Sequence, residues 1–253
     1  MLRILQSTVF NNFTNLTHGT VYEENEISKT NHPVNFSYSV GENPQIIDQN
    51  YQKFSKFIGI SEENIKRVKQ THSSNVVIVN DYKMPNYHYQ ADALITDLPN
   101  ICLAITTADC LPIFIYADDK KYIANIHAGW RGAKDLIIEN TITKLIDLGC
   151  DPINMKAAIM PAIDVKSYEV QKNFCDNFAN NTKNFTDFII TNKNKYFFDL
   201  KKFAYDKLSK LLIKKIEIVN YDSFSTQYLF SHRDTIKNNA IVGRNLNFIC
   251  LKK

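Results

Sequence analysis

The sequence predicts an α/β protein, or more broadly an α+β protein, that forms a single domain over residues 1–253. Three short apolar runs, rich in β-branched and aromatic residues, follow one another in the middle of the chain. A segment with helical periodicity comes directly after them. No linker, repeat or strongly biased tract divides the chain, and 253 residues lie within the range of one large domain.

The three central runs are ICLAIT, LPIFIYA and YIANIHA, at residues 101–106, 111–117 and 122–128. Each has the length of a strand, and the turn sequence DDKK separates the second run from the third. Because polar and apolar residues hardly alternate along them, we expect one sheet built from all three runs, with both faces covered. An earlier strand is expected over residues 75–79.

After Gly132 the apolar residues recur with the period of a helix over residues 133–148, and Gly149 predicts the end of that helix. The hexapeptide HAGWRG at 127–132 is therefore a turn from strand to helix. We expect Gly129 and Gly132 to let the chain bend there. Turns of this kind often carry functional residues in α/β proteins.

Predicted strands and helices continue to alternate towards the C-terminus. Short β-rich segments predict strands over residues 155–160, 215–220 and 246–251. The apolar stripe of residues 199–215 predicts an amphipathic helix. The asparagine-rich stretch NFANNTKNFTDF, residues 177–188, is predicted to be a surface loop between helices.

Composition and charge indicate a soluble protein without a nucleic-acid partner. Hydrophobic residues make up 44% of the chain and charged residues 22%, which is ordinary for a globular domain. The net charge of +4 comes from scattered lysines, whereas nucleic-acid binding concentrates basic residues on one face. No apolar run approaches the ~20 residues that span a bilayer, and the first residues do not resemble a signal peptide. Five cysteines without a CxxC pair favour reduced thiols. We therefore expect a cytoplasmic protein with no membrane contact and no obligate protein partner.

Four polar residues stand where apolar runs begin or end. Asp109 and Cys110 lie between two predicted strands, His127 ends the third run, and His72 precedes the strand expected at 75–79. A single buried cysteine is usually a small hydrophobic residue, and a single histidine usually has a structural role. From spacing alone, the existence of a Cys–His site stays open.

Six ordered motifs make the chain resemble the laccase-domain proteins, also called the polyphenol-oxidase or peptidoglycan-editing-factor family. The motifs are QTHSSNVVIV, ADALIT, TTADCLPIFIY, NIHAGWRGA, PAIDVKSYEV and FSHRDT followed by GR, and the resemblance runs from about Asn35 to Leu251. It implies one α/β domain with mixed sheets covered by helices, related to the Cys–His deamidase-like fold. It also implies a zinc site made by His72, Cys110 and His127.

The chemistry of these three residues agrees with that implication. Thiolate and imidazole suit Zn²⁺, and the same set could also hold Cu²⁺. Three protein ligands leave a fourth position open, which is typical of catalytic zinc. Cys110 would then be a metal ligand and a catalytic residue together. Asp109 is a second catalytic candidate, as a group that orients a ligand or moves a proton, or else a turn carboxylate satisfied by backbone N–H groups.

Substrate-binding candidates lie near the same motifs. Arg131 and Arg233 could bind phosphate through their planar guanidinium groups, or form ordinary salt bridges. Arg244 is similar, and Asn35 matches the family's early asparagine segment and could reach the pocket. Trp130 either walls the pocket or fills the core.

The chain departs from the family pattern in places. Met160 precedes Pro161 where the family often has Gly, and Asp164 replaces another glycine. The segment around Arg233 lacks a preceding cysteine and has one arginine where the family has two, with His232 in the place of a usual tyrosine. The three zinc positions are intact, so these departures concern the substrate pocket.

The resemblance implies purine nucleoside metabolism: phosphorolysis of adenosine, inosine and methylthioadenosine, and deamination of adenosine. The expected partners are therefore nucleosides and phosphate. One alternative is a Cys–His amide hydrolase that acts in peptidoglycan-precursor editing, with Cys110 as nucleophile and His72 or His127 as base. A copper oxidoreductase is a further alternative, although six histidines and no His-x-His pair do not suit a multicopper site. A binding module without catalysis is the remaining one.

Overall fold

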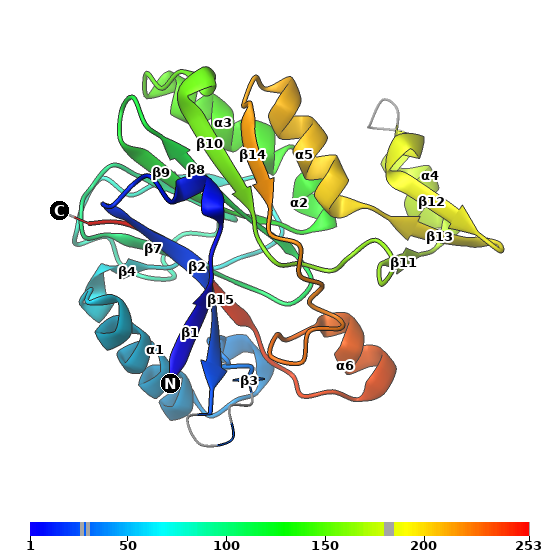
Figure 1. Cartoon of the computed structure of the whole chain (residues 1–253), viewed down its shortest axis with the longest axis horizontal. Coiled ribbons are helices and arrows are strands. Elements are labelled where there is room, and N and C mark those ends of the chain that lie inside the picture. The colour runs from blue at the N-terminus through cyan, green and yellow to red at the C-terminus, as the bar shows by residue number, and fades with distance from the viewer. Residues whose placement is uncertain (26–27, 29–30, 180–184, 253) are drawn as a thin grey trace.

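Two β-sheets pack face to face, and helices cover the outer face of each sheet (Figure 1). The computed structural model describes residues 1–25, 28, 31–179 and 185–252. Within these residues each of the two sheets has six strands, and both contain parallel as well as antiparallel pairs. The predicted α/β class with mixed sheets and covering helices is confirmed.

The first sheet contains the strands nearest both chain ends (Figure 1). Its order is β1–β2–β15–β7–β4, and β3 pairs with β2. The bounds are β1 Leu2–Leu5, β2 Leu16–Glu24, β3 Asn31–His32, β4 Ile65–Lys66, β7 Cys102–Thr107 and β15 Asn245–Leu251. Helix α1 (Pro44–Ile58) covers its outer face with Ile47, Tyr51, Phe54 and Ile58.

The second sheet has the order β14–β10–β8–β9–β6–β5. The bounds are β5 Val76–Ile78, β6 Ala93–Thr96, β8 Leu111–Ala117, β9 Tyr122–Ala128, β10 Met155–Ile159 and β14 Lys215–Ile218. Helices α2 (Trp130–Lys134), α3 (Ile137–Asp147) and α5 (Leu200–Lys210) lie on its outer side. Along β8, Ile113 and Ile115 pack towards the helices, while Phe114 and Tyr116 pack towards the first sheet. Both faces are therefore buried, as the apolar runs predicted.

A buried asparagine joins the two sheets. The side-chain amide of Asn125, in β9, donates to the carbonyl oxygens of Leu103 in β7 and Asn247 in β15, at 2.9 and 3.0 Å. Leaving a buried carbonyl oxygen without a hydrogen bond costs free energy. The two hydrogen bonds from Asn125 therefore stabilise the packing of one sheet against the other.

The prediction that the three central runs form one sheet is wrong. β8 and β9 pair with each other in the second sheet, whereas β7 pairs with β15 and β4 in the first. The chain crosses between the sheets at residues 108–110, where Asp109 adopts a left-handed conformation with φ 80°. This crossing is a tertiary feature that the apolar pattern of each run does not encode.

Two helical predictions also needed correction. The helix expected over 133–148 is divided into α2 and α3 by Leu136, whose φ is 72°. The helix expected over 199–215 ends at Lys210, and Leu212 is left-handed with φ 70°. The predicted end at Gly149, with φ 87°, is confirmed.

The stretch 177–188 is not a loop where it is described. Helix α4 (Lys172–Ala179) includes its first residues, and a short 3-10 helix (Phe185–Phe188) includes its last. Phe178, Phe185 and Phe188 are buried in the core, which explains the phenylalanines among the asparagines. Residues 180–184 of the predicted loop lie outside the described residues.

The remaining elements are a third, small sheet and one more helix. A small sheet of order β11–β13–β12 lies beside α4, and α6 (His232–Asn238) precedes β15. The strands of this small sheet are β11 Glu169–Val170, β12 Ile189–Asn192 and β13 Lys195–Phe198. No helix in the described part of the chain has the length and apolar character needed to cross a bilayer.

Candidate active site

Three segments far apart in the sequence bring His72, Cys110 and His127 together. His72 lies in the loop between β4 and β5, Cys110 in the crossing between β7 and β8, and His127 is the penultimate residue of β9. The three candidate ligand atoms lie within 4.8 Å of one another. This is the group of potential metal ligands found among the described residues.

The geometry of the group fits a tetrahedral metal. The Sγ of Cys110 lies 3.7 Å from the Nε2 of His72. Zn–S and Zn–N bonds at a tetrahedral angle separate these two atoms by about 3.6 Å. The imidazole rings of His72 and His127 are 4.9 Å apart and nearly perpendicular, so they converge on one point without stacking. The three side chains can therefore hold a metal with little movement.

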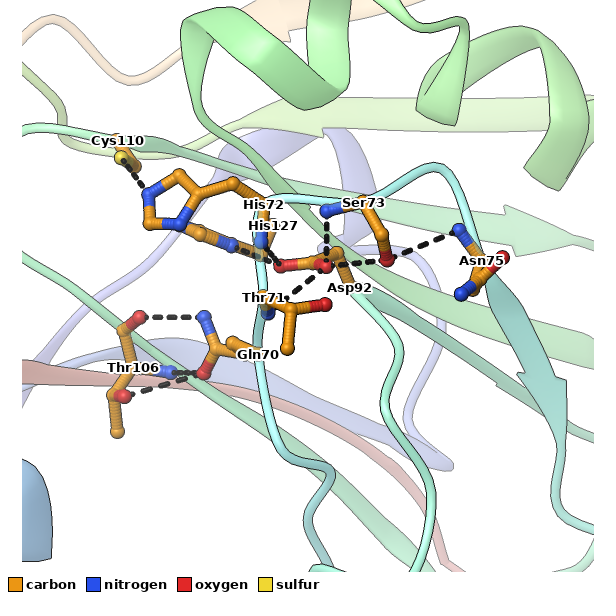
Figure 2. A network of polar contacts seen from close by, with 9 residues as sticks. All are labelled: Gln70, Thr71, His72, Ser73, Asn75, Asp92, Thr106, Cys110 and His127. Carbon is orange, nitrogen blue, oxygen red and sulfur yellow. Dashed lines mark hydrogen bonds and ion pairs between the residues drawn. The ribbon is translucent and has the colours of Figure 1, made fainter.

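Asp92 organises two of the three ligands, and the sequence did not single it out. Its fully buried carboxylate accepts hydrogen bonds from the backbone N–H groups of Thr71, His72 and Ser73 and from the Ser73 hydroxyl (Figure 2). It also lies 2.7 Å from the Nδ1 of His127. One carboxylate thus fixes both the His72 loop and the His127 ring. An acid directly before the apolar strand in ADALIT is the signal that could have indicated it.

The Asp92 contact also decides which nitrogen of His127 is free. With Nδ1 donating to Asp92, Nε2 is directed away from that carboxylate and is available as a ligand. A carboxylate behind a histidine is the usual support of a metal site, because it fixes the ring and makes it a better donor. Burial raises the pKa of Asp92, but the hydrogen bond and charge of His127, together with Ser73, lower it to about 2.

Electrostatics favour a charged Cys–His pair. Burial raises the pKa of the Cys110 thiol, but the charges and hydrogen bonds of His127 and His72 outweigh it and lower the pKa to about 6. Burial lowers the pKa of His127, but the Cys110 thiolate and Asp92 raise it to about 9. A thiolate is the form of cysteine that binds metals and attacks electrophiles. A metal bound at Nε2 of His127 would displace the proton from that nitrogen, while Nδ1 keeps its proton for Asp92.

The glycines of HAGWRG provide space, and the prediction that they allow a sharp bend is wrong. Gly129 has φ −70° and ψ 163°, which other residues adopt readily, and Gly132 has no positive φ. A Cβ at Gly129 would lie 2.6 Å from the Cδ2 of His72 and 3.0 Å from the Sγ of Cys110. A Cβ at Gly132 would lie 3.0 Å from the carbonyl oxygen of Ser73. Glycine here lets the β9–α2 turn approach the ligands.

A second polar clamp holds the His72 loop against the first sheet. The Gln70 side chain accepts from the backbone N–H of Thr106 and donates to its carbonyl oxygen, at 2.8 and 2.9 Å (Figure 2). The amide therefore pairs with β7 as a neighbouring strand would. The clamp places His72 beside the crossing that carries Cys110.

A cavity of about 700 Å³ opens over the three ligands. Arg131, Arg233 and Arg244, all named as candidates from the sequence, line it. None of the ion pairs among the described residues involves these three arginines. His232, which stands in the place of a usual tyrosine of the family and was expected to be incidental, also lines the cavity. The cavity therefore has an excess of positive charge beside the ligands.

Aromatic side chains lie beside the arginines in the cavity wall. Trp130, Tyr168 and Phe174 line the cavity, and the Trp130 and Phe174 rings are 5.1 Å apart. Trp130 also packs against the main core, so it performs both of the roles considered for it. The Arg131 guanidinium lies 4.4 Å from the Trp130 ring, a cation–π contact that positions it at the wall.

Asp109 and Asn35 occupy different layers of the site. Asp109 lines the cavity, and its carboxylate accepts from the Ser223 hydroxyl at 2.7 Å and the Arg233 backbone N–H at 2.6 Å. Asn35 is buried behind the cavity wall, where its Oδ1 accepts from the backbone N–H groups of Ser37 and Arg244. The hydrogen-bond partners of Asn35, Ser37 and Arg244, line the cavity in its place. Direct contact of Asn35 with a substrate therefore stays a prediction.

Comparison with known sequences matches almost the whole chain. The family model described as multi-copper polyphenol oxidoreductase laccase matches residues 17–252. A purine nucleoside phosphorylase of Rickettsia conorii is 30% identical over 217 residues, which cover 84% of this chain and 81% of that protein. A purine nucleoside phosphorylase of Aquifex aeolicus is 33% identical over 181 residues, covering 72% and 81%.

Solved structures share the fold. The hypothetical protein YfiH of Bacillus licheniformis superimposes with a TM-score of 0.81 at 24% identity, covering 96% of this chain and 94% of the other. YlmD of Geobacillus stearothermophilus gives a TM-score of 0.82 at 21% identity, covering 98% and 94%. At these identities the likeness concerns the fold.

Proposed function

We propose that this protein is a zinc-dependent purine nucleoside phosphorylase. The premise is its family: the chain belongs to the laccase-domain family described as multi-copper polyphenol oxidoreductase laccase. The names of its relatives from Rickettsia conorii and Aquifex aeolicus support this activity. The proposed substrates are adenosine, inosine and methylthioadenosine, with phosphate as co-substrate. Deamination of adenosine is a second activity of the same proposal.

One observation carries the proposal: the potential metal ligands line the same cavity as three arginines that have no ion-pair partner in the described part of the chain. Its volume of about 700 Å³ suits a nucleoside together with phosphate. Guanidinium groups bind phosphate through paired hydrogen bonds. The aromatic wall provides flat apolar surface for a purine base. These features together favour a nucleoside and an anion bound side by side.

Each residue has a proposed part in the reaction. Arg131 and Arg233 bind phosphate, and Asp109 holds the backbone of Arg233 in place. A phosphate oxygen then forms the bond to C1′ of the ribose while the C1′–N9 bond breaks, and the purine leaves with the proton that the hydrogen phosphate gives up. The products are ribose 1-phosphate and the free base. When bound by His72, Cys110 and His127, zinc would supply Lewis acidity and a bound water of lowered pKa.

Product analysis tests this function. Purified protein is incubated with inosine or adenosine, with and without phosphate, and the bases, nucleosides and ribose 1-phosphate are separated by chromatography. Phosphorolysis gives free base and ribose 1-phosphate only when phosphate is present, whereas deamination gives inosine from adenosine without phosphate. The absence of ribose 1-phosphate and of inosine under all conditions refutes the proposal.

Phosphate binding is tested by substitution. Arg131→Met and Arg233→Met each raise the KM for phosphate by about tenfold or more, because a charge-assisted hydrogen bond is lost. Arg3→Met is the matched control, since Arg3 lies in β1 and pairs with Glu24. An unchanged KM in both cavity variants would assign the positive charge another purpose.

The Cys–His–Asp arrangement favours one alternative, an amide hydrolase acting in peptidoglycan-precursor editing. Cys110 has a lowered pKa and lies beside two histidines, one of which is held by Asp92. This is also the arrangement of a nucleophile, a base and an orienting group. Metal content separates the two functions, because a stoichiometric zinc ion makes Cys110 a ligand and leaves no free nucleophile.

Copper oxidation has less support. The described residues contain one group of potential metal ligands, made of two histidines and one cysteine, and the chain has six histidines. A multicopper centre needs more ligands than this group provides. Metal analysis of the purified protein decides between zinc and copper, and stoichiometric copper would overturn the assignment of zinc.

A further inference from the structure

A second cavity lies beside the active-site cavity and has a different character. Its volume is about 600 Å³, and we name it the tyrosine cavity after Tyr38, Tyr51 and Tyr87 in its wall. It shares four lining residues with the first cavity, Ser37, Ser39, Gln70 and Thr106. Two cations, Arg67 and Lys69, line it, and its lining includes no carboxylate. The tyrosine cavity is therefore an aromatic space with net positive charge.

Arg67 is the unusual residue of this cavity. The residue is 8% exposed, and its Nε and Nη1, which solvent does not reach, have no hydrogen-bond partner among the described residues. None of the ion pairs in that part of the chain involves it. Most buried charged groups are paired, because removing a charge from water is costly. A buried guanidinium with unpaired donors in the lining of a cavity is a candidate for binding an anion there.

Tyrosine rings hold the guanidinium in a fixed place. Its central carbon lies 4.0 Å from the centre of the Tyr51 ring and 5.2 Å from that of Tyr87. The Arg67 backbone is fixed as well, since its N–H donates to the Asn86 side chain and its carbonyl oxygen accepts from the Tyr87 N–H. Cation–π contacts offset part of the cost of burial but satisfy no N–H donor. The rings thus hold the guanidinium in the wall of the cavity before any ligand arrives.

The remaining lining selects for a flat molecule. Tyr38 and Tyr87 keep about two fifths of their surface exposed, at 38% and 41%, and their rings meet edge to face with centres 6.0 Å apart. The Tyr51 ring lies parallel to that of Tyr38, 6.3 Å away. Such rings favour an aromatic ligand that packs in an offset or edge-to-face arrangement. Lys69, exposed at the wall, adds a second positive charge.

We propose that the tyrosine cavity is a second small-molecule site, which binds a planar aromatic oxyanion whose phosphate or carboxylate group accepts hydrogen bonds from Arg67. The planar guanidinium matches either group in geometry. The proposal does not depend on the reaction in the first cavity. Because four residues line both cavities, the occupant lies against the wall that positions Gln70, and through it the His72 loop.

Arginine side-chain NMR tests the site directly in the wild-type protein. The chain has five arginines, so the spectrum of arginine Nε–H groups is simple, and the Arg67 signal is the one lost in Arg67→Lys. Phenyl phosphate and benzoate are the two anionic probes, and benzamide is the neutral control. The Arg67 signal shifts with one or both anions and not with benzamide. Which anion causes the shift at lower concentration identifies phosphate or carboxylate as the ligand group.

Calorimetry on variants provides the second test. Arg67→Met weakens binding of the preferred anion by about tenfold or more, since a charge-assisted hydrogen bond to a buried donor is removed. Arg67→Lys keeps the charge but loses the planar pair of donors, and gives an intermediate loss. Arg3→Met, in β1, binds as the wild type does.

A purely structural role for Arg67 predicts different results. In that case Arg67→Met melts at a lower temperature than the wild type, and neither anion moves the Arg67 signal. An Arg67 signal that stays fixed at millimolar concentrations of both anions overturns the proposal. Equal affinity of the wild type and Arg67→Met for both anions overturns it as well.

Discussion

Gly129→Ala tests whether the glycine of the β9–α2 turn exists to make room for metal ligands. The added Cβ would lie 2.6 Å from the Cδ2 of His72, whereas carbon atoms in contact are about 3.5–4.0 Å apart. The His72 ring must therefore move by about 1 Å, while metal–ligand distances tolerate about 0.2 Å. A displacement of this size lowers function about 100-fold. We expect zinc affinity to fall by about that factor, or roughly 3 kcal/mol.

The fold of this variant should survive, because φ −70° and ψ 163° suit alanine. Replacing the residue at the start of α2 costs about 1 kcal/mol of folding free energy. Gly59→Ala is the opposite control: a Cβ there has open space, but φ 69° is strained for alanine, at about 1–2 kcal/mol. Zinc affinity is measured by competition with a chromogenic chelator, and stability by urea unfolding. Wild-type zinc affinity in Gly129→Ala would refute this reasoning.

Three further predictions concern the support of the site and the core. Asp92→Asn lowers zinc affinity by about 10- to 100-fold, because the ring of His127 loses its carboxylate partner; retention of zinc against the same chelator would contradict this. Burial lowers the pKa of His18 to about 4 from the unfolded value of 6.5, so the unfolded chain binds the extra proton as pH falls between these values. Urea unfolding of the wild type should lose about 3 kcal/mol more over that range than unfolding of His18→Gln, and parallel pH profiles would exclude the effect. Asn125→Ala removes the donor that joins the two sheets and costs about 1–3 kcal/mol in urea unfolding; a loss below about 0.5 kcal/mol would show that packing alone holds the sheets together.

Local sequence patterns predict strands and helices correctly where neighbouring residues alternate between the buried faces of one element. The runs at 111–117 and 122–128 coincide with β8 and β9, because every second residue meets one of two buried faces. The helix after Gly132 was predicted, but its interruption at Leu136 was not, since a left-handed leucine leaves no signature in the apolar period.

The candidate ligands were identified by resemblance to a family, and the geometry then brought His72, Cys110 and His127 within reach of one metal. Local sequence does not indicate the role of Asp92, because that role exists only when the 71–73 loop and His127 surround the carboxylate. The sequence around Gly129 predicts a bend, whereas the glycine is needed for its close approach to His72, which is distant in sequence.

The sequence by itself determined the α/β class and the central strands, since these depend on local period. Its resemblance to a family, and not its local pattern, indicated the thiolate–imidazole metal site. Only the tertiary structure decided that β7 and β8 belong to different sheets, that one carboxylate serves two ligands, and that Arg67 is buried beside tyrosines. Each of these depends on contacts between segments far apart in the chain. Such contacts are selected by the packing of whole sheets, and no short stretch of sequence contains them.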